Sequence, residues 1–254
     1  MNWNMNAKGL IFDYGGTIDT NSVHWSEVLW DGYVASGIAV DKQAFRDAYV
    51  HGERTLARQP LIRPEHTMLD LLRIKVGIEL QWLAESGEWT MDNGQWKMEN
   101  GKWKMDKEKE VKEKGEAVAD HCYAHVLQVL ETSRAVLQRL SERYPMVLVS
   151  NFYGNIRAIL QDFRLDLFQD VVESAVVGIR KPDPRIFQLG VDALGMAAQD
   201  VVVIGDSYSK DIVPAASIGC QTVWIRGRGW ADEEVDEALP SAIISTIQEL
   251  THIL

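Results

Sequence analysis

The residue with the clearest chemical potential is Asp13, which follows an apolar run, Gly9–Phe12, and precedes the turn Tyr14-Gly15-Gly16-Thr17. The run is typical of a buried β-strand. An acid at the end of such a strand points into the crevice where open α/β sheets bind ligands. Backbone N–H groups of a glycine-rich turn can meet an anion in the same place. Asp13 therefore marks a candidate site for chemistry on an anion.

Three later segments place matching chemistry at the ends of strands or in loops. They are Val149-Ser150-Asn151, Arg180-Lys181-Pro182 and Gly205-Asp206-Ser207, the last followed by Asp211. With Asp13 they supply a nucleophile, a hydroxyl, a cation and a pair of acids suited to a metal. One acid after a strand is common, so the four segments are informative only together.

The hydrophobic pattern predicts the elements that position these residues. Residues 8–13 predict a first strand, 20–83 show helical spacing, and a further helix is expected over 107–129. Later strands are predicted over 146–150, 171–177, 201–205 and 222–226, and helices over 132–143, 154–163, 184–195, 209–218 and 241–253. Alternating strands and helices with continuous apolar strands predict a doubly wound, Rossmann-like α/β core with a parallel sheet.

The first strand must belong to this core, because Leu10-Ile11-Phe12 would otherwise have no sheet. The helical block that follows it is then an insertion. We predict an α/β core domain from residues 1–19 and 131–254, and an inserted helical cap over 20–130.

A seven-residue repeat lies between residues 86 and 106, beginning at Trp89, Trp96 and Trp103. Trp and Met recur two residues apart, which does not fit a coiled-coil seam. Two Asn-Gly pairs are typical of type I′ hairpin turns. We predict a three-stranded antiparallel β-meander in which Met91 pairs with Trp96 and Met98 with Trp103; a disordered repeat is the alternative. Its apolar face suits packing on the cap, on a partner or in a homo-oligomer.

Bulk composition excludes several classes of protein. The formal net charge of −11 over 254 residues argues against general affinity for nucleic acid or an anionic membrane. No run reaches the roughly 18–20 apolar residues of a membrane helix. The N-terminal residues lack the apolar stretch of a signal peptide, so a cytoplasmic location is expected. Cys122 and Cys220 form no metal or redox motif.

In four ordered motifs the chain resembles the haloacid dehalogenase-like (HAD) hydrolases whose helical cap is inserted after the first strand. The motifs are those around Asp13, Ser150, Lys181 and Asp206. The resemblance covers residues 8–19 and about 131–230, and it reaches the cap only by position and helical character. It implies the HAD fold and a hydrolase activity.

By this resemblance Asp13 is the nucleophile, which forms an aspartyl-phosphate and so splits hydrolysis into two easier displacements. Mg²⁺, which prefers oxygen ligands, would be held by Asp13, Asp206 and the backbone carbonyl of Gly15. Asp211 would hold a metal-bound water or orient the lysine. The competing interpretation of Asp211 is a first-turn acid stabilised by the helix dipole.

The resemblance also implies which residues bind phosphate. Ser150 would donate to a phosphoryl oxygen, aided by the Asn151 amide. Lys181 would place positive charge on the nucleophile and the transferred group. Thr17 would bond the nucleophile region through its hydroxyl or amide.

The sequence departs from the family at Gly15. Phosphatases of the family usually carry a second Asp at this position, which protonates the leaving oxygen and activates water. Such general acid–base help is worth about 10²–10⁴ in rate. Asp19 and His24 are candidate replacements because they lie in the hinge that follows the catalytic loop, and histidine titrates near neutral pH. For His24 the competing interpretation is a polar residue at a helix start.

The leading hypothesis is a Mg²⁺-dependent phosphatase of a small phosphorylated metabolite, with substrate choice made by the cap. Gly15 keeps a dehalogenase- or phosphonatase-like hydrolase open as an alternative. A third hypothesis is a catalytically weak phosphate-binding protein that uses its cap and repeat for partners.

Overall fold

The computed structural model describes residues 5–89, 96–99, 102–105, 107–227 and 234–254. Contacts divide the chain into two compact units. The core unit contains the chain up to Glu27 and from Val126 onward, and the helical unit contains Val28–His125. The sequence analysis places the boundaries after residues 19 and 130, whereas these units divide after residues 27 and 125.

The core unit is built on a six-stranded sheet in which all neighbouring strands are parallel, in the order β5-β4-β1-β6-β7-β8. The strands are β1 (Gly9–Phe12), β4 (Met146–Ser150), β5 (Asp170–Glu173), β6 (Val201–Gly205), β7 (Gln221–Ile225) and β8 (Ala242–Ile244). The helices between them are α5 (Ile156–Asp162), α6 (Ser174–Val177), α7 (Arg185–Leu194), η1 (Ala198–Asp200), η2 (Tyr208–Ile212) and α8 (Val213–Ser217). The predicted doubly wound α/β core is confirmed.

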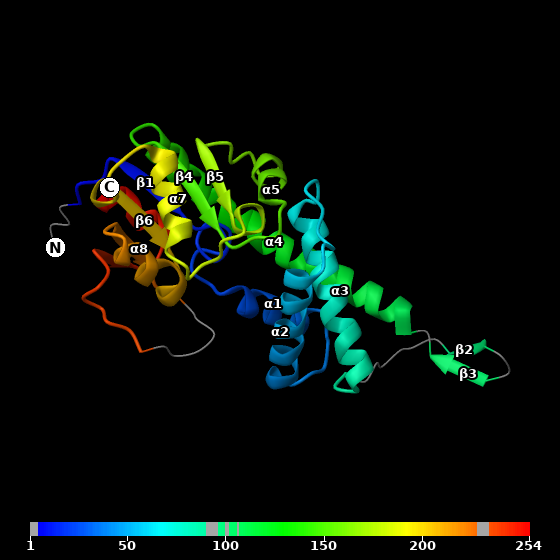
Figure 1. Ribbon diagram of the computed structural model, residues 1–254. Helices are drawn as coiled ribbons and strands as arrows, with labels where there is room; N and C mark the ends of the chain where they lie inside the picture. The colour runs from blue at the N-terminus through cyan, green and yellow to red at the C-terminus, as the bar shows by residue number, and fades with distance from the viewer. Residues whose placement is uncertain (1–4, 90–95, 100–101, 106, 228–233) are drawn as a thin grey trace. The chain divides into compact units, whose positions relative to one another are not determined.

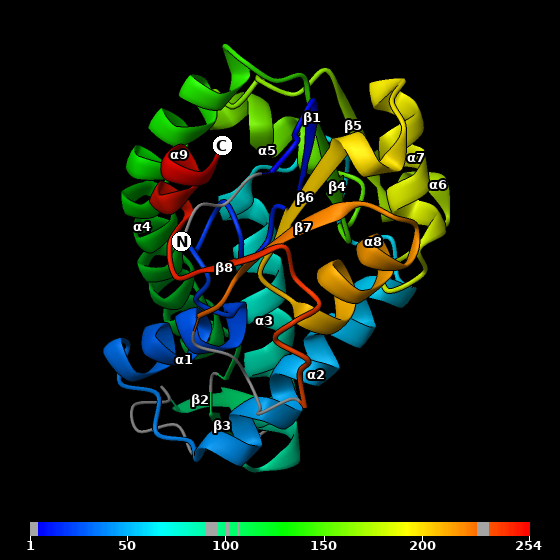
Figure 2. The same cartoon turned by 90° about the vertical axis from the view of Figure 1, so that its left-hand side faces the viewer.

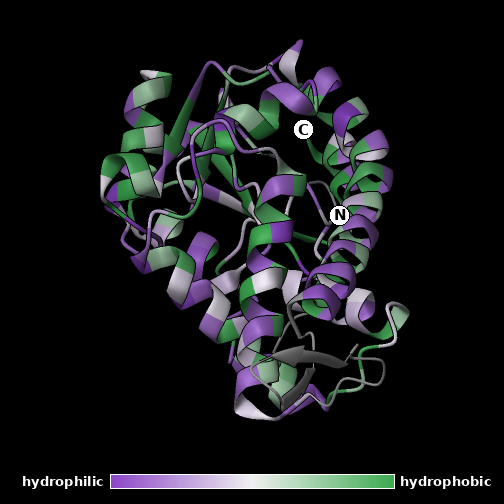
Figure 3. Ribbon diagram, turned by 90° about the vertical axis from the view of Figure 1, so that its right-hand side faces the viewer, coloured by the Kyte–Doolittle hydropathy of each residue, from purple (hydrophilic) through white to green (hydrophobic). Residues whose placement is uncertain are grey.

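Helices cover both faces of this sheet. On one face, Ile11, Val147 and Val203 pack in a buried cluster with Phe187 and Val191 of α7. Figures 1 and 2 show α7 and α8 over this face, with the C-terminal part of α4 and α9 over the other. In Figure 3 the helices carry hydrophilic and hydrophobic bands, as expected of elements with one face on a core. Because both sheet faces are buried, the strands are continuous apolar runs.

The strand predicted over 171–177 is wrong in its second half. β5 ends at Glu173, and α6 follows until Gly178, which has a φ of +70°. Val176 is 72% exposed. Its β-branched side chain favoured a strand, but the residue lies beyond the sheet, where no strand partner covers it.

Two other helix predictions need correction. The helices predicted over 107–129 and 132–143 form one helix, α4 (Lys107–Ser141), because neither glycine nor proline interrupts the sequence after Gly115. The helix predicted over 241–253 begins instead as β8, whose apolar residues pair with β7 at the sheet edge. Only η3 (Ile247–Glu249) and α9 (Leu250–Ile253) follow it as helix.

The helical unit contains most of α1 (Trp25–Ala35), with α2 (Lys42–Arg58), α3 (Met68–Ser86) and the N-terminal part of α4. A capping box between Thr67 and Asp70 fixes the start of α3. The Tyr33 ring packs edge-on against Phe45, with centroids 5.0 Å apart. Among the residues that the structure describes, no helix has both the length and the apolar character to cross a membrane.

Between α3 and α4 lies an antiparallel hairpin of β2 (Trp96–Glu99) and β3 (Lys102–Met105). Met98 pairs with Trp103, which confirms this part of the predicted register. The first strand of the predicted meander, with the pairing of Met91 and Trp96, falls on residues 90–95. Those residues lie outside the described part of the chain.

The helical unit buries a polar cluster between α2 and α3. Lys75 forms an ion pair with Glu53, and its amine lies 4.3 Å from the centroid of the Tyr49 ring. Glu79 is fully buried and accepts a hydrogen bond of 3.1 Å from the Tyr33 hydroxyl. Burial, offset in part by Lys75, raises the pKa of Glu79 to about 7. Glu79 therefore links the stability of this unit to pH.

Glu79→Gln tests this link. The folded protein holds the Glu79 proton more tightly than the unfolded chain, in which the pKa of glutamate is about 4.3. The free energy of unfolding should therefore fall as pH rises from about 4 to 7, by at most about 3 kcal/mol for this group. Urea unfolding across this range should show a shallower fall in Glu79→Gln.

The matched control is Glu85→Gln, which changes an exposed glutamate on the same helix. It should keep the pH dependence of the wild type. Parallel curves for wild type and Glu79→Gln would show that the buried carboxyl does not titrate in this range.

Candidate active site

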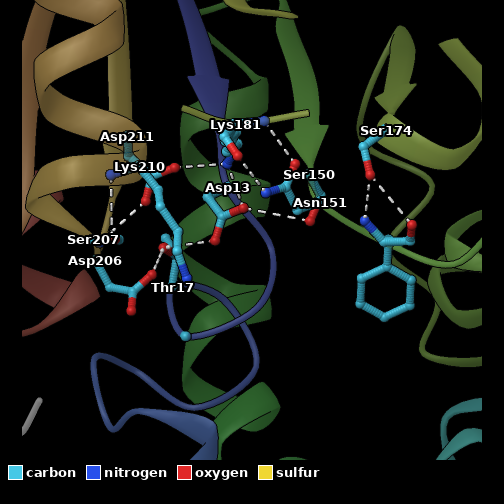
Figure 4. Close-up of polar contacts among 12 residues, drawn as sticks. Asp13, Thr17, Ser150, Asn151, Ser174, Lys181, Asp206, Ser207, Lys210 and Asp211 are labelled. Carbon is cyan, nitrogen blue, oxygen red and sulfur yellow. Dashed lines mark hydrogen bonds and ion pairs between the residues drawn. The ribbon is translucent and has the colours of Figure 1, made fainter. Parts of the chain in front are cut away.

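The carboxyl ends of β1, β4 and β6 lie side by side in the sheet and carry Asp13, Ser150 and Asp206. Asp13 extends the strand pairing, since its backbone N–H donates to the carbonyl of Ile204 at 2.9 Å. Figure 4 shows Asp13 with Lys181, Ser150 and the Asp206–Asp211 segment around it. The four segments singled out in the sequence thus converge on one place.

Lys181 reaches Asp13 from the loop before α7. Its ammonium group donates to Oδ1 of Asp13 at 2.6 Å and to Oδ1 of Asp211 at 2.7 Å, and its side chain is 2% exposed. Burial alone would lower the pKa of Lys181, but the carboxylates of Asp13 and Asp211 raise it above the usual value. The lysine is therefore a fixed positive charge.

Asn151 holds the lysine loop in place. Its side-chain amide donates to the carbonyl of Lys181 at 3.1 Å, and its side-chain oxygen accepts from the Lys181 backbone N–H at 2.9 Å. Both ends of the Asn151 side chain are engaged in this contact. Asn151 thus fixes the position of the Lys181 backbone.

Thr17 and Ser150 place hydroxyl groups beside Asp13. The Thr17 hydroxyl lies 3.5 Å from Oδ2 of Asp13 and 3.2 Å from Oδ1 of Asp206. The Ser150 hydroxyl lies 3.4 Å from Oδ1 of Asp13. These distances are long for O–H···O bonds, which are usually about 2.7–2.8 Å. Both hydroxyls can turn to a bound anion at little cost.

The acids around Lys181 carry more negative charge than the lysine balances. Asp13, Asp206 and Asp211 each offer a carboxylate oxygen within 4.8 Å of the others. Burial, and repulsion from the other carboxylates, raise the pKa of Asp13 and that of Asp206 above their usual range, although Lys181 opposes this for both. A divalent cation with oxygen ligands, such as Mg²⁺, fits this set because it would neutralise the surplus charge.

The loop that carries Asp206 is anchored on both sides. The indole N–H of Trp224, on β7, donates to the Asp206 carbonyl at 2.8 Å. The Ser207 backbone N–H donates to Oδ2 of Asp211 at 3.0 Å. Since Oδ1 of Asp211 accepts from Lys181, this one carboxylate connects the acid loop to the lysine. Trp224 was not singled out in the sequence, because a tryptophan in an apolar strand looks like an ordinary core residue.

Asp19 is fully buried beside the turn that follows Asp13. Its Oδ1 accepts from the Gly16 backbone N–H at 2.8 Å, and its Oδ2 accepts from the Trp25 indole N–H at 3.0 Å. Burial raises the pKa of Asp19 to about 7. Each oxygen of Asp19 thus holds one donor of the turn or of the residues that follow it. The contacts therefore favour a positioning role for Asp19 over the predicted acid–base role.

His24 has the contacts of a residue at a helix start. Its Nδ1 lies 2.8 Å from the Ser26 hydroxyl and accepts from the Ser26 backbone N–H at 3.1 Å, directly before α1. These bonds match the competing interpretation of His24, in which it begins a helix. They give no support to His24 as a proton donor.

Glu173 and Ser174, at the end of β5, hold the loop that follows β4. The Glu173 carboxylate accepts from the Gly154 backbone N–H at 2.5 Å. The Ser174 hydroxyl accepts from the Phe152 backbone N–H at 3.1 Å and donates to the Phe152 carbonyl at 3.3 Å (Figure 4). The sequence prediction missed them because it ran the strand through to 177. The glutamate within that apolar run was the signal that the strand ended.

A family model described as haloacid dehalogenase-like hydrolase matches residues 7–219. The match spans every motif of the candidate site. The chain therefore belongs to the HAD-like hydrolase family, in agreement with its motifs.

Several curated relatives are phosphatases by name. The chain is 30% identical over 132 residues to glyceraldehyde 3-phosphate phosphatase of Methanocaldococcus jannaschii, which covers 52% of this chain and 56% of the relative. It is 36% identical over 83 residues to phosphoserine phosphatase of Thermus thermophilus, covering 33% and 32%. It is 33% identical over 132 residues to haloacid dehalogenase-like hydrolase domain-containing protein 3 of Bos taurus, covering 50% and 51%. The chain thus spans about half or less of the length of these relatives.

Solved structures show the same fold over nearly the whole chain. A magnesium-bound HAD-hydrolase, YfnB of Bacillus subtilis, superposes with a TM-score of 0.57 at 18% identity, over 98% of each chain. A dehalogenase in an intermediate complex gives a TM-score of 0.61 at 16% identity, again over 98% of each chain. At these identities the likeness concerns the fold alone.

Adjacent glycines in the turn after Asp13 differ in the space around them. At Gly16, where φ is +98°, an added Cβ would lie 2.3 Å from Oδ2 of Asp206. At Gly15 an added Cβ would meet the Trp25 indole at 3.7 Å, an ordinary contact. Gly16 is required by the turn, whereas Gly15 leaves room for a side chain.

We therefore expect Gly16→Ala to lower the free energy of unfolding by about 1–3 kcal/mol or more, through backbone strain and the clash with Asp206. Gly15→Ala should change it by less than about 1 kcal/mol. Urea unfolding of the two variants gives the comparison. Equal losses in both would mean that the turn does not have this geometry.

Proposed function

We propose that the protein is a Mg²⁺-dependent phosphatase that hydrolyses a small phosphorylated metabolite through an aspartyl-phosphate on Asp13. The observation that carries the proposal is the buried contact in which Lys181 joins Asp13 to Asp211, with Asp206 across Thr17 from Asp13. An attacking carboxylate, a fixed positive charge and surplus acid oxygens suit a phosphate that arrives with a divalent cation.

The residues divide the work as follows. Asp13 attacks phosphorus. Lys181 holds the Asp13 carboxylate in place and offsets the charge that builds up on the transferred group. The hydroxyls of Ser150 and Thr17 donate to phosphoryl oxygens. Water then hydrolyses the aspartyl-phosphate and restores the carboxylate.

The metal would be held by Asp13, Asp206 and the backbone carbonyl of Gly15. When bound, Mg²⁺ offsets the repulsion between the carboxylate and the phosphate. Asp211 orients Lys181, as its 2.7 Å contact supports.

The comparisons support the substrate class. Glyceraldehyde 3-phosphate phosphatase and phosphoserine phosphatase are named for small phosphate esters, and the net charge of −11 argues against nucleic acid as a substrate. A cytoplasmic location, and self-association through the Trp/Met repeat, remain expectations from the sequence.

The absent acid at Gly15 keeps one alternative, a dehalogenase- or phosphonatase-like hydrolase. The surplus of buried carboxylates around Lys181 suits a divalent cation, and such a cation would offset the charge of a phosphate substrate. This observation makes the phosphatase the better-supported activity. A halide-release assay run without metal addresses the alternative directly.

Asp13→Asn is expected to abolish phosphate release from a panel of metabolite phosphates assayed with Mg²⁺, because the amide oxygen is a far weaker nucleophile. Asp166→Asn, which changes an exposed aspartate of the core unit, is the matched control and should retain activity. Equal activity in Asp13→Asn and wild type would remove Asp13 from the mechanism. Ligand binding without turnover on any phosphate would favour the catalytically weak binding protein.

Metal binding can be tested without turnover. Mg²⁺ at about 100 times its dissociation constant should stabilise the wild type by about 2.7 kcal/mol. Asp206→Asn should lose this gain. Because the folded-state pKa of Asp206 is raised, its ionised form opposes folding above the usual carboxyl range. The metal-free variant should therefore unfold at a higher temperature than the metal-free wild type at about pH 8. An unchanged Mg²⁺ response would exclude Asp206 as a ligand.

A further inference from the structure

The backbone geometry at position 15 does not require a glycine. Its φ lies outside the left-handed region, and a Cβ there would touch only the Trp25 indole among the described residues, at 3.7 and 3.8 Å. A Cβ could therefore be added at this position, where the family resemblance expects a proton donor. The turn supplies the space but no acid.

The carboxylates nearest to this turn already have partners. Asp19 accepts from Gly16 and from Trp25 through its two oxygens. Asp211 accepts from Lys181 through one oxygen and from the Ser207 backbone through the other.

The remaining groups of the site are equally committed. Asp13 is the proposed nucleophile and Asp206 the proposed metal ligand. The Lys181 amine lies between two carboxylates, to both of which it donates. Within the described part of the core unit, the site thus contains attacking, binding and charge-balancing groups, but each of its acids is engaged elsewhere.

We propose that this site acts on phosphoryl compounds whose leaving group departs as a stable anion, such as acyl, enol or aryl phosphates, and that its aspartyl-phosphate accumulates during turnover. The inference rests on the proposed phosphatase function and deepens it. A leaving group that is stable as an anion needs no proton as its bond to phosphorus breaks. An alkoxide does need one, and general acid help is then worth about 10²–10⁴ in rate.

Formation and hydrolysis of the aspartyl-phosphate can both proceed without a side-chain acid. An oxygen of Asp13 forms a bond to phosphorus, while the bond from phosphorus to the leaving oxygen breaks and that oxygen keeps the electron pair. Water then attacks phosphorus, the bond to the Asp13 oxygen breaks, and the carboxylate returns. The proton lost by the water passes to solvent. Because the second step also lacks a base at position 15, it is slow and the intermediate builds up.

The leaving-group dependence of kcat/KM tests the first step. Wild type is assayed with Mg²⁺ on aryl phosphates from nitrophenyl to phenyl, and then on alkyl phosphates. We expect kcat/KM to fall steeply as the leaving group becomes less acidic. Gly15→Asp should raise kcat/KM for alkyl phosphates by about 10²–10⁴-fold and flatten the series. Gly15→Asn, which has the same size but no acid, should keep the steep dependence.

The intermediate tests the second step. Wild type should release a burst of leaving group equal to the enzyme present, and acid-quenched enzyme should carry one phosphoryl group by intact mass. Gly15→Asp should show neither. Thermal unfolding of each variant shows whether it is folded, and the slope and burst of the wild type decide the inference even if a variant is not.

Failure of this inference can be distinguished from failure of the proposed phosphatase function. Phosphate release with a flat leaving-group series and no burst would overturn the inference and leave the phosphatase intact. No release from any phosphate, by wild type or Gly15→Asp, would overturn both.

Discussion

The candidate site depends on the buried ammonium group of Lys181, which lies between the carboxylates of Asp13 and Asp211. Buried charges are tolerated when they are paired, and here the pairing also fixes geometry. Asp13 ends a central strand, and Asp211 ties the lysine to the loop of Asp206 through Ser207. Because one cation serves several acids, the site keeps a surplus of negative charge. That surplus is the physical reason why a divalent cation fits this site.

The parallel sheet makes this arrangement possible. Strands β4, β1 and β6 are neighbours and end at one edge, so residues far apart in the chain meet there. Supporting contacts come from the flanking strands. Trp224 of β7 holds the Asp206 carbonyl, and Glu173 and Ser174 at the end of β5 hold the loop after β4. The candidate site is thus built at the ends of sheet strands and held by hydrogen bonds to backbone atoms.

Sequence reasoning worked well for the central strands, because strands buried on both faces are continuous apolar runs. It was weaker where the local sequence pattern does not match the burial or pairing of the residues in the fold. Val176 looks like a strand residue but is exposed in α6, and β8 looked like part of a helix until its pairing with β7 was seen. The supporting residues were missed for a related reason. Trp224 and Ser174 bond to backbone atoms of distant segments, and no local spacing reports such partners.

The order of residues along the chain is enough to identify the chemical groups: an acid after a strand, a hydroxyl, a lysine before a proline, and a second acid pair, with a glycine where an acid was expected. The contacts that these groups make depend on the folded chain. Lys181 bonds to Asp13 across 168 residues, Asp19 has both oxygens engaged, and Gly15 proves to have room for a side chain that it does not carry. The periodicity of hydrophobic residues indicates which face of a helix or strand is buried. The partner of a polar atom, in contrast, depends on which distant residues the fold places next to it.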